Sequence, residues 1–306
     1  MTLRNRALAG AAAILLLAAG QAIAATEPPP PAPSTRLFQD SKIIVRDRIS
    51  VEVIGKGPDL VFIPGLASSR ETWRATAERL RGHYRLHLIQ VAGFAGEPAR
   101  ANATGPVLAP TAEAIDAYIV EAKLSPAVVI GHSLGGTIGL YLAEHHPEHL
   151  KKVLVVDALP AFAAVMLGPQ ASAEQITGVA ERIRANPMPG GGAAAAMARM
   201  ATSQADRDRI AAWSAASAPA AVASAMADDL ELNLSPGLAA IKTPITVLYP
   251  DYVAAGLSPG MADGMYGGVF TPMPGKTLKR VDASLHFIML DQPATFAADL
   301  DAFLAQ

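Results

Sequence analysis

The hydrophobic and polar residues of the chain alternate between short apolar runs and longer amphipathic segments. Apolar runs at 59–65, 84–93 and 150–159 are typical of buried strands. Segments at 69–82 and 110–124 space their apolar residues three or four positions apart, which predicts amphipathic helices between these strands. Strands that alternate with helices in this way predict a mostly parallel sheet with helices on both faces.

The alternation of strands and helices stops near Pro160. Residues 161–235 are rich in Ala and Met, and they show only helix-like segments. The strand pattern returns at 243–250 and 276–282, and a last amphipathic helix is predicted at 293–305. A helical segment inserted into an α/β sheet is the simplest arrangement that fits this order.

The domain organisation follows from these boundaries. Two strands with loosely alternating polar and apolar residues, at 41–47 and 49–57, are typical of a sheet edge exposed on one face. We therefore predict an α/β core made of residues 38–160 and 236–306, with residues 161–235 as a helical cap.

The first residues, 1–24, have the pattern of an export signal. Arg4 and Arg6 precede an apolar run at 7–20, and Ala-Ile-Ala at 22–24 matches a signal-peptidase site. We expect cleavage before Ala25, which makes the protein periplasmic or secreted, without stable membrane insertion afterwards. The alternative is an uncleaved anchor, although the apolar run is short for a membrane span.

Composition narrows the class of protein further. Hydrophobic residues make up 51% of the 306 residues, which is typical of a globular chain, while the proline-rich stretch at 25–37 predicts an extended linker. The formal net charge of -2 argues against nucleic-acid binding, which needs a basic face. Because the sequence contains no cysteine, disulfides, a thiol nucleophile and cysteine-ligated metals are excluded.

A Gly-x-Ser-x-Gly motif, Gly131-His132-Ser133-Leu134-Gly135, lies where a predicted strand meets a predicted helix. This context is the one in which the motif forms a nucleophile elbow: small residues permit a sharp turn, and the helix start faces the developing negative charge. A purely structural turn is the alternative. The apolar strand before the motif and the helix after it favour Ser133 as a nucleophile.

The stretch VVIGHSLGGTIGLYLAEHHPEHLKKVLVVD, residues 128–157, resembles the elbow, helix and following strand of the α/β-hydrolase superfamily. The order of predicted elements over residues 40–306 is similar to that superfamily as well. The resemblance implies an α/β-hydrolase fold with a helical cap inserted between strands. It also implies a Ser-His-Asp triad and serine-hydrolase chemistry, with no cofactor and no metal.

A serine hydroxyl needs a base within hydrogen-bond reach. His286 follows the last predicted strand, which is where similar hydrolases carry their catalytic histidine. His132 is next to the serine, and we expect its side chain to point away around the turn. His145, His146 and His149 cluster at a predicted helix end, where interaction with the helix dipole is the simpler explanation.

The sequence leaves the third member of the triad open. Asp251 follows the strand at 243–250, where related hydrolases place their acid, but the customary preceding glycine is absent. Asp157 directly follows an earlier strand, and some cap-bearing relatives use a carboxylate at that place. We favour Asp251, with Asp157 as the alternative and Asp263 as a weaker one.

The oxyanion hole is predicted from backbone N–H groups. One donor is Leu134, immediately after the serine, and the second is Leu66, or else Ala67, in the loop after the strand at 59–65. Similar enzymes often read His-Gly in this loop, whereas this chain has Pro64-Gly65. A backbone donor does not depend on that replacement.

Together these features predict an exported, carboxylesterase-like serine hydrolase that cleaves carboxylic ester or lactone bonds through an acyl-serine intermediate. We expect an apolar or acyl-like small molecule as substrate, because the predicted cap carries apolar residues suited to a lining: Met166, Met188, Met197, Met200, Trp213 and Met226. A C–C bond hydrolase, a cofactor-free haloperoxidase and an acyltransferase remain alternatives on the same triad. An inactive ligand-binding homologue is an alternative of another class.

Overall fold

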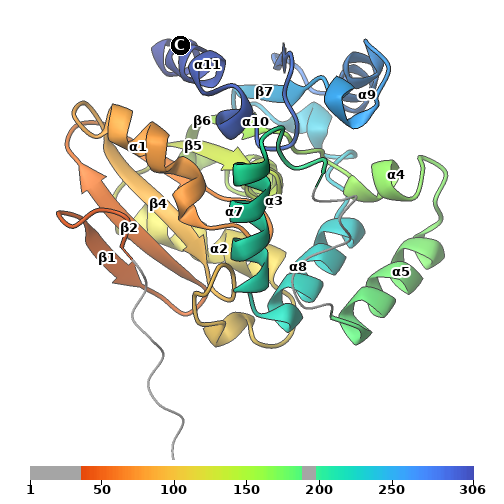
Figure 1. Cartoon of the computed structure of the whole chain (residues 1–306), viewed down its shortest axis with the longest axis horizontal. Coiled ribbons are helices and arrows are strands. Elements are labelled where there is room, and N and C mark those ends of the chain that lie inside the picture. Colours follow the sequence, from red (N-terminus) through yellow and green to blue (C-terminus); the bar gives the residue numbers. More distant parts are fainter. Residues whose placement is uncertain (1–35, 188–197) are drawn as a thin grey trace, which may run out of the picture. The chain divides into compact units, whose positions relative to one another are not determined.

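The computed structural model describes residues 36–187 and 198–306, and it contains one eight-stranded sheet in the order β1-β2-β4-β3-β5-β6-β7-β8 (Figure 1). The two junctions β1–β2 and β2–β4 are antiparallel, and the remaining neighbours are parallel. The strands are β1 (Lys42–Val45), β2 (Ile49–Gly55), β3 (Asp59–Ile63), β4 (Arg85–Val91), β5 (Ala127–His132), β6 (Leu150–Val156), β7 (Ile245–Pro250) and β8 (Thr277–Val281). The predicted signal peptide, residues 1–24, lies outside the described residues.

Helices cover both faces of the sheet because successive strand residues point to opposite sides. Phe62 of β3 packs with Trp73 and Phe296 in one buried cluster, whereas the next residue, Ile63, lies with Ile138 in the other. The first face is covered by α1 (Arg74–Leu80), α10 (Ile288–Asp291) and α11 (Pro293–Ala305). The second is covered by α2 (Leu108–Glu121), α3 (Leu134–His145) and α9 (Met261–Phe270). The predicted mostly parallel sheet with helices on both faces is confirmed.

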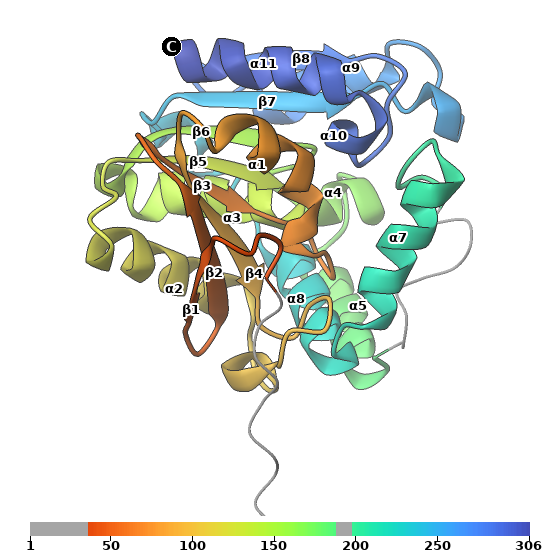
Figure 2. The same ribbon diagram turned by 60° about the vertical axis from the view of Figure 1, so that its left-hand side comes forward.

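The described parts of the segment between β6 and β7 contain helices that gather on one side of the sheet (Figure 2). Its described helices are α4 (Phe162–Met166), α5 (Ala173–Ala185), α7 (Gln204–Ala215) and α8 (Pro219–Glu231). The start and the end of this segment lie side by side, because Leu234 N donates a hydrogen bond to Pro160 O at 2.8 Å. The segment is attached to the loop after β4, where Ala218 N donates to Gly93 O at 2.7 Å and Gly96 N donates to Ala216 O at 3.0 Å.

Two elements differ in detail from the sequence-based prediction. The helix expected at 69–82 begins as a 3₁₀ turn, η1 (Arg70–Trp73), and continues as α1. Helix α9 was not predicted, because three glycines interrupt its apolar pattern. The other short 3₁₀ helices are η2 (Arg100–Asn102), η3 (Pro147–His149), η4 (Leu238–Ala240) and η5 (Val253–Ala255).

Among the described residues, no single helix has both the length and the apolar character to cross a membrane. Helices α7 and α8 meet these criteria only when taken together, and they are bent by 105° relative to each other. Met188 and Met197, two of the side chains expected to line the cap, lie outside the described residues.

Candidate active site

Ser133 lies at the sharp turn between β5 and α3. Its backbone has φ 52° and ψ −125°, a left-handed conformation that costs free energy for any residue other than glycine. The turn is secured on both sides: Ser133 N donates to Val156 O of β6 at 2.9 Å, and its carbonyl accepts from Thr137 N at 3.0 Å. A strained, hydrogen-bonded serine at a strand-to-helix junction is the geometry of a nucleophile elbow.

The glycines of the motif are required by close approach of the backbone. A Cβ atom on Gly131 would overlap the carbonyl oxygen of Gly135, and one on Gly135 would overlap the carbonyl oxygen of Ile63. Gly65 of the loop after β3 is similarly close, since an added Cβ would lie 3.0 Å from Ser133 Cβ. The chain can therefore turn sharply at Ser133, because these three glycines have no side chains that would fill the space around the turn.

His286 and Asp157 form a close pair beside the elbow. His286 Nδ1 lies 2.6 Å from Asp157 Oδ2, and the exposed fractions of the two side chains are 20% and 3%. Asp157 follows Val156, the residue whose carbonyl holds Ser133 N, so the end of β6 brings the carboxylate next to the elbow. Asp157 also adopts a left-handed backbone, with φ 50°, and its N–H donates to Leu248 O at 2.8 Å.

The preference for Asp251 is not supported by this geometry. Asp251 Oδ2 accepts from Ala283 N at 2.9 Å and Oδ1 accepts from Val253 N at 3.2 Å, so the side chain joins the turns after β7 and β8. No hydrogen bond or ion pair joins it to His286 in the described part of the chain. Asp263 pairs with Arg280 and accepts from the Tyr249 hydroxyl at 2.9 Å, so it also bonds elsewhere.

Two tyrosines complete the surroundings of Asp157. The Tyr252 hydroxyl donates to Oδ2 at 2.5 Å, and the Tyr266 hydroxyl donates to Oδ1. Burial raises the pKa of Asp157, but the charge and hydrogen bond of His286 and the two phenol hydrogen bonds outweigh it, so the net pKa lies below its usual value. Burial, followed by the nearby carboxylate, raises the pKa of both tyrosines well above 10. These groups therefore keep Asp157 ionised and the phenols protonated.

His132 has a role that sequence reasoning missed. Its side chain does not point away from the site: Nε2 lies 2.9 Å from the carbonyl oxygen of His286, and the two ring centroids are 4.6 Å apart. Burial lowers the pKa of His132 to about 3, so the ring is neutral, and its single proton must sit on Nε2 to donate to that carbonyl. His132 thus supports the backbone that carries His286. The sequence contains no signal from which this role of the residue before the elbow serine could be predicted.

The two predicted oxyanion donors belong to segments that adjoin the serine. Leu134 is the first residue of α3, and Leu66 lies in the loop that passes over Ser133 at Gly65. Neither N–H donates a hydrogen bond within residues 36–187 and 198–306, which leaves both available to a ligand. The next residue, Ala67, has φ 52°.

Buried polar side chains hold this loop. Gln90 Nε2 donates to Ser68 O at 3.0 Å, and Gln90 Oε1 accepts from Arg70 N at 2.8 Å. Ser217, from the turn between α7 and α8, accepts a hydrogen bond at its Oγ from Ala95 N of the loop after β4, at 2.8 Å. The loop after β3 is therefore fixed from the sheet, and the loop after β4 is fixed from the inserted segment.

The inserted segment also contacts the loop that carries His286. Phe287 N donates to Met200 O at 2.9 Å, and Asp291 accepts from both Thr202 N and Leu285 N at 2.7 Å. Of the side chains expected to line the cap, Trp213 is buried, with its ring 6.4 Å from that of Phe287, whereas Met166 on α4 is 57% exposed.

Comparison with known proteins agrees with this architecture. Residues 58–185, from β3 to the end of α5, match the family described as alpha/beta hydrolase fold. Together with the eight-stranded sheet, this match shows that the chain has the α/β-hydrolase fold. An esterase from Thermogutta terrifontis has a similar structure, with a TM-score of 0.67 and 19% identity over 84% of this chain and 94% of that one. An enol-lactonase from Burkholderia xenovorans LB400 superimposes with a TM-score of 0.64 and 16% identity over 84% and 96% of the two chains.

One sequence relative of this chain is the pimeloyl-[acyl-carrier protein] methyl ester esterase of Vibrio vulnificus. It is 34% identical over 110 residues, which are 36% of this chain and 40% of the relative. The chain thus spans about two fifths of that relative's length. The likeness to the solved structures extends over much more of the chain, and at their low sequence identities it establishes the fold.

Proposed function

We propose that this protein is a serine hydrolase of the carboxylesterase type, with Ser133, His286 and Asp157 as its triad. The observation that carries the proposal is an elbow serine, with φ 52°, whose neighbour His132 has its ring 4.6 Å from that of His286, a histidine with Nδ1 2.6 Å from a buried aspartate. The α/β-hydrolase fold and the esterase relatives support the same reaction class.

In the proposed reaction, the Ser133 hydroxyl oxygen attacks the ester carbonyl while His286 Nε2 takes the hydroxyl proton. Asp157 holds His286 Nδ1–H and stabilises the imidazolium that forms. The backbone N–H groups of Leu134 and Leu66 stabilise the tetrahedral oxyanion. His286 then returns the proton to the leaving alcohol, and an acyl-serine remains.

The second half of the reaction repeats these roles with water. His286 takes a proton from water, the resulting hydroxide attacks the acyl carbonyl, and the oxyanion forms in the same place. Collapse of this intermediate releases the carboxylic acid and returns the proton to Ser133.

We propose a small or medium carboxylic ester or lactone with an apolar acyl group as substrate. The support is twofold. The relatives in sequence and structure include two esterases and an enol-lactonase. The loop that carries His286 also packs against an aromatic ring of the inserted segment, with the Trp213 ring 6.4 Å from that of Phe287. From the pattern of residues 1–24, we propose that the protein acts in the periplasm or outside the cell.

An inactive homologue was an alternative because Asp251 looked poorly placed for an acid. That argument loses its basis, since Asp157 occupies the position beside His286. Ser133, His286, Asp157 and the N–H groups of Leu134 and Leu66 would supply the nucleophile, base, acid and oxyanion donors, and this supports our proposal of an active enzyme.

The test is hydrolysis of p-nitrophenyl acetate, butyrate and octanoate, together with labelling by a fluorophosphonate probe. We expect activity and one adduct on Ser133 in the wild type, and neither in Ser133→Ala, with a loss on the order of 10⁶-fold in kcat. Ser258→Ala, an exposed serine remote in sequence from the motif, is the control and keeps full activity. Folded wild-type protein that neither turns over nor takes the label would contradict the proposal.

A further inference from the structure

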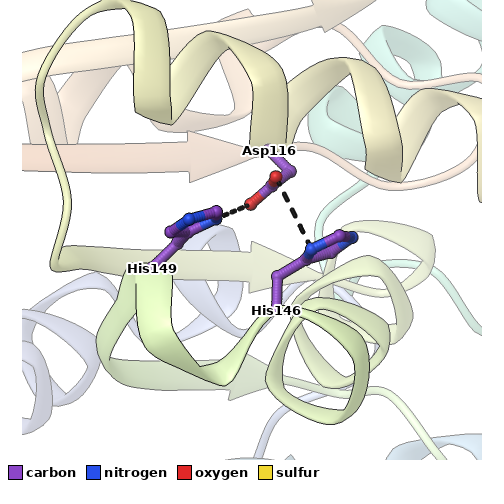
Figure 3. Close-up of side chains that lie close together, drawn as sticks. All are labelled: Asp116, His146 and His149. Atoms are coloured by element: carbon purple, nitrogen blue, oxygen red, sulfur yellow. Dashed lines mark hydrogen bonds and ion pairs between the residues drawn. The ribbon is translucent and has the colours of Figure 1, made fainter.

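At the far end of α3 from Ser133, one aspartate and two histidines face one another (Figure 3). Asp116 projects from α2, His146 immediately precedes η3, and His149 is the last residue of η3, which follows α3. His149 Nδ1 lies 2.7 Å from Asp116 Oδ1, and His146 Nδ1 lies 3.6 Å from Asp116 Oδ2. One donor atom from each of the three residues lies within 4.8 Å of the others. This group is called the histidine pair site below.

Both imidazole rings present the same nitrogen to the centre of the site. Nδ1 of each ring faces Asp116, while the outer nitrogens face other carboxylates. His146 Nε2 lies 3.0 Å from Glu113, and His149 Nε2 lies 3.9 Å from Glu148. In metal sites, a ligating histidine commonly donates its second N–H to a carboxylate, which directs the lone pair of the first nitrogen to the ion. The His146 ring has this pattern, whereas His149 Nε2 lies too far from Glu148 for a hydrogen bond.

The backbone holds the donors in place before any ion is bound. His146 and His149 are separated by one 3₁₀ turn that contains Pro147, and His149 N donates to His146 O at 3.1 Å. Their ring planes are within 4° of parallel, with centroids 6.0 Å apart. Asp116 is buried at 8% exposure in the middle of a helix of 14 residues. Such preorganisation reduces the entropy lost when a ligand binds.

We propose that the histidine pair site binds a zinc-like divalent cation through Asp116 and the Nδ1 atoms of His146 and His149, with water in the fourth position. With zinc–ligand distances of about 2.0–2.1 Å, neighbouring ligand atoms of a tetrahedral ion are ~3.3 Å apart. The two observed separations from Asp116, 2.7 and 3.6 Å, lie on either side of that value, and one donor atom from each residue lies within 4.8 Å of the others, so the side chains would close around the ion as it binds. Two imidazole nitrogens favour zinc over calcium or magnesium, which prefer oxygen ligands.

The site is separate from the proposed catalytic centre. Helix α3 has 12 residues, which corresponds to about 18 Å of helix between the elbow and the histidine pair site. Its ligands come from α2 and from the turn after α3, so a bound ion would join two helices on the same face of the sheet. The proposed role is stabilisation of that face, and it does not depend on the hydrolase reaction.

The test uses the full-length wild-type protein, freed of metal by a chelator and titrated with ZnCl₂ by isothermal calorimetry. We expect one site that is lost in the double variant Asp116→Asn, His149→Gln and kept in His145→Gln. His145 is the matched control, because it adjoins the cluster while its Nδ1 bonds to Tyr141 O at 3.0 Å. Glu113→Gln removes the carboxylate behind His146 and should weaken binding by about 10- to 100-fold.

Two further readouts separate ligation from non-specific binding or misfolding. Co²⁺ bound to the wild type should give the intense visible absorption of a tetrahedral ion, and the double variant should not. Zn²⁺ should raise the melting temperature of the wild type and of His145→Gln, but not that of the double variant. Equal Zn²⁺ affinity in wild type and double variant, or no binding by the wild type, would overturn the proposal.

Discussion

The two ends of α3 each hold a histidine–aspartate pair, yet their surroundings point to different chemistry. His286 Nδ1 lies 2.6 Å from Asp157, and His149 Nδ1 lies 2.7 Å from Asp116. Around Asp157 the additional groups are hydrogen-bond donors, the hydroxyls of two tyrosines. Around Asp116 the additional group is a second imidazole, with further carboxylates outside it.

This difference teaches that the pair alone does not define a site. At the elbow end, the two additional hydrogen-bond donors stabilise the ionised carboxylate of Asp157 in one orientation. This is what the acid of a triad requires. At the other end of α3, the nitrogen lone pairs of the two imidazole rings favour the binding of a cation. The elbow end also has a strained serine beside the histidine, and the other end has none among the described residues.

The largest expected effect comes from removing the charge at the elbow end. Asp157→Asn should lower kcat by on the order of 10⁴-fold, because the amide no longer holds the productive tautomer or stabilises the imidazolium. Asp251→Asn is the matched control, since among the described residues its side chain bonds to the backbone N–H groups of Val253 and Ala283 and not to His286. It should stay within a few-fold of the wild type in p-nitrophenyl ester hydrolysis. The reverse ranking of the two variants would restore Asp251 as the acid.

The next effect concerns the support of His286. His132→Phe keeps an aromatic ring beside His286 but removes the N–H that holds its carbonyl. We expect kcat to fall by about 10- to 100-fold with little change in KM, because a small displacement of a catalytic group has this cost. His87→Phe, at another buried and hydrogen-bonded histidine, is the control. A similar fall in kcat for both variants would indicate a general loss of structure rather than a positioning role.

A smaller effect is expected from each tyrosine donor. Tyr252→Phe and Tyr266→Phe each remove one hydrogen bond to a charged carboxylate, which contributes about 1.5 kcal/mol or more, so each should lower kcat by about 10-fold. The control is Tyr249→Phe, whose hydroxyl donates to Asp263 and whose ring stacks on Tyr266 at 4.5 Å. If all three variants behave alike, the phenols do not act through Asp157.

The smallest expected effect, counted for each pH unit, is on the free energy of unfolding. The pKa of His132 is lowered from 6.5 to about 3 by burial, so between these values the unfolded chain binds a proton that the folded chain does not. The stability contribution of the neutral ring is complete above pH 6.5 and is lost as the pH falls toward 3. Urea unfolding of the wild type should lose up to about 1.4 kcal/mol per pH unit more than His132→Phe does. Equal slopes would mean that His132 is not held neutral.

The sequence by itself was sufficient for the fold and for the position of the elbow. Apolar periodicity identified the strands from β3 to β8 and the helices between them, because burial on a sheet and on a helix imposes different spacings along the chain. Helix α9 escaped this reasoning, since its glycines hide an apolar face that only packing onto the sheet reveals. The motif at 131–135 was readable because the glycines are needed locally, by backbone contacts within a few residues.

Only the tertiary structure decided the partners of the histidines. Asp157 and Asp251 follow neighbouring strands, β6 and β7, so both sequence positions are compatible with an acid near His286. Which carboxylate meets His286 depends on the backbone turn after each strand and on Tyr252 and Tyr266, which come from distant segments. In the same way, His145, His146 and His149 read as one cluster at a helix end. Packing of α2 against α3 separates them, because it places Asp116 between the last two and leaves the first on its own helix.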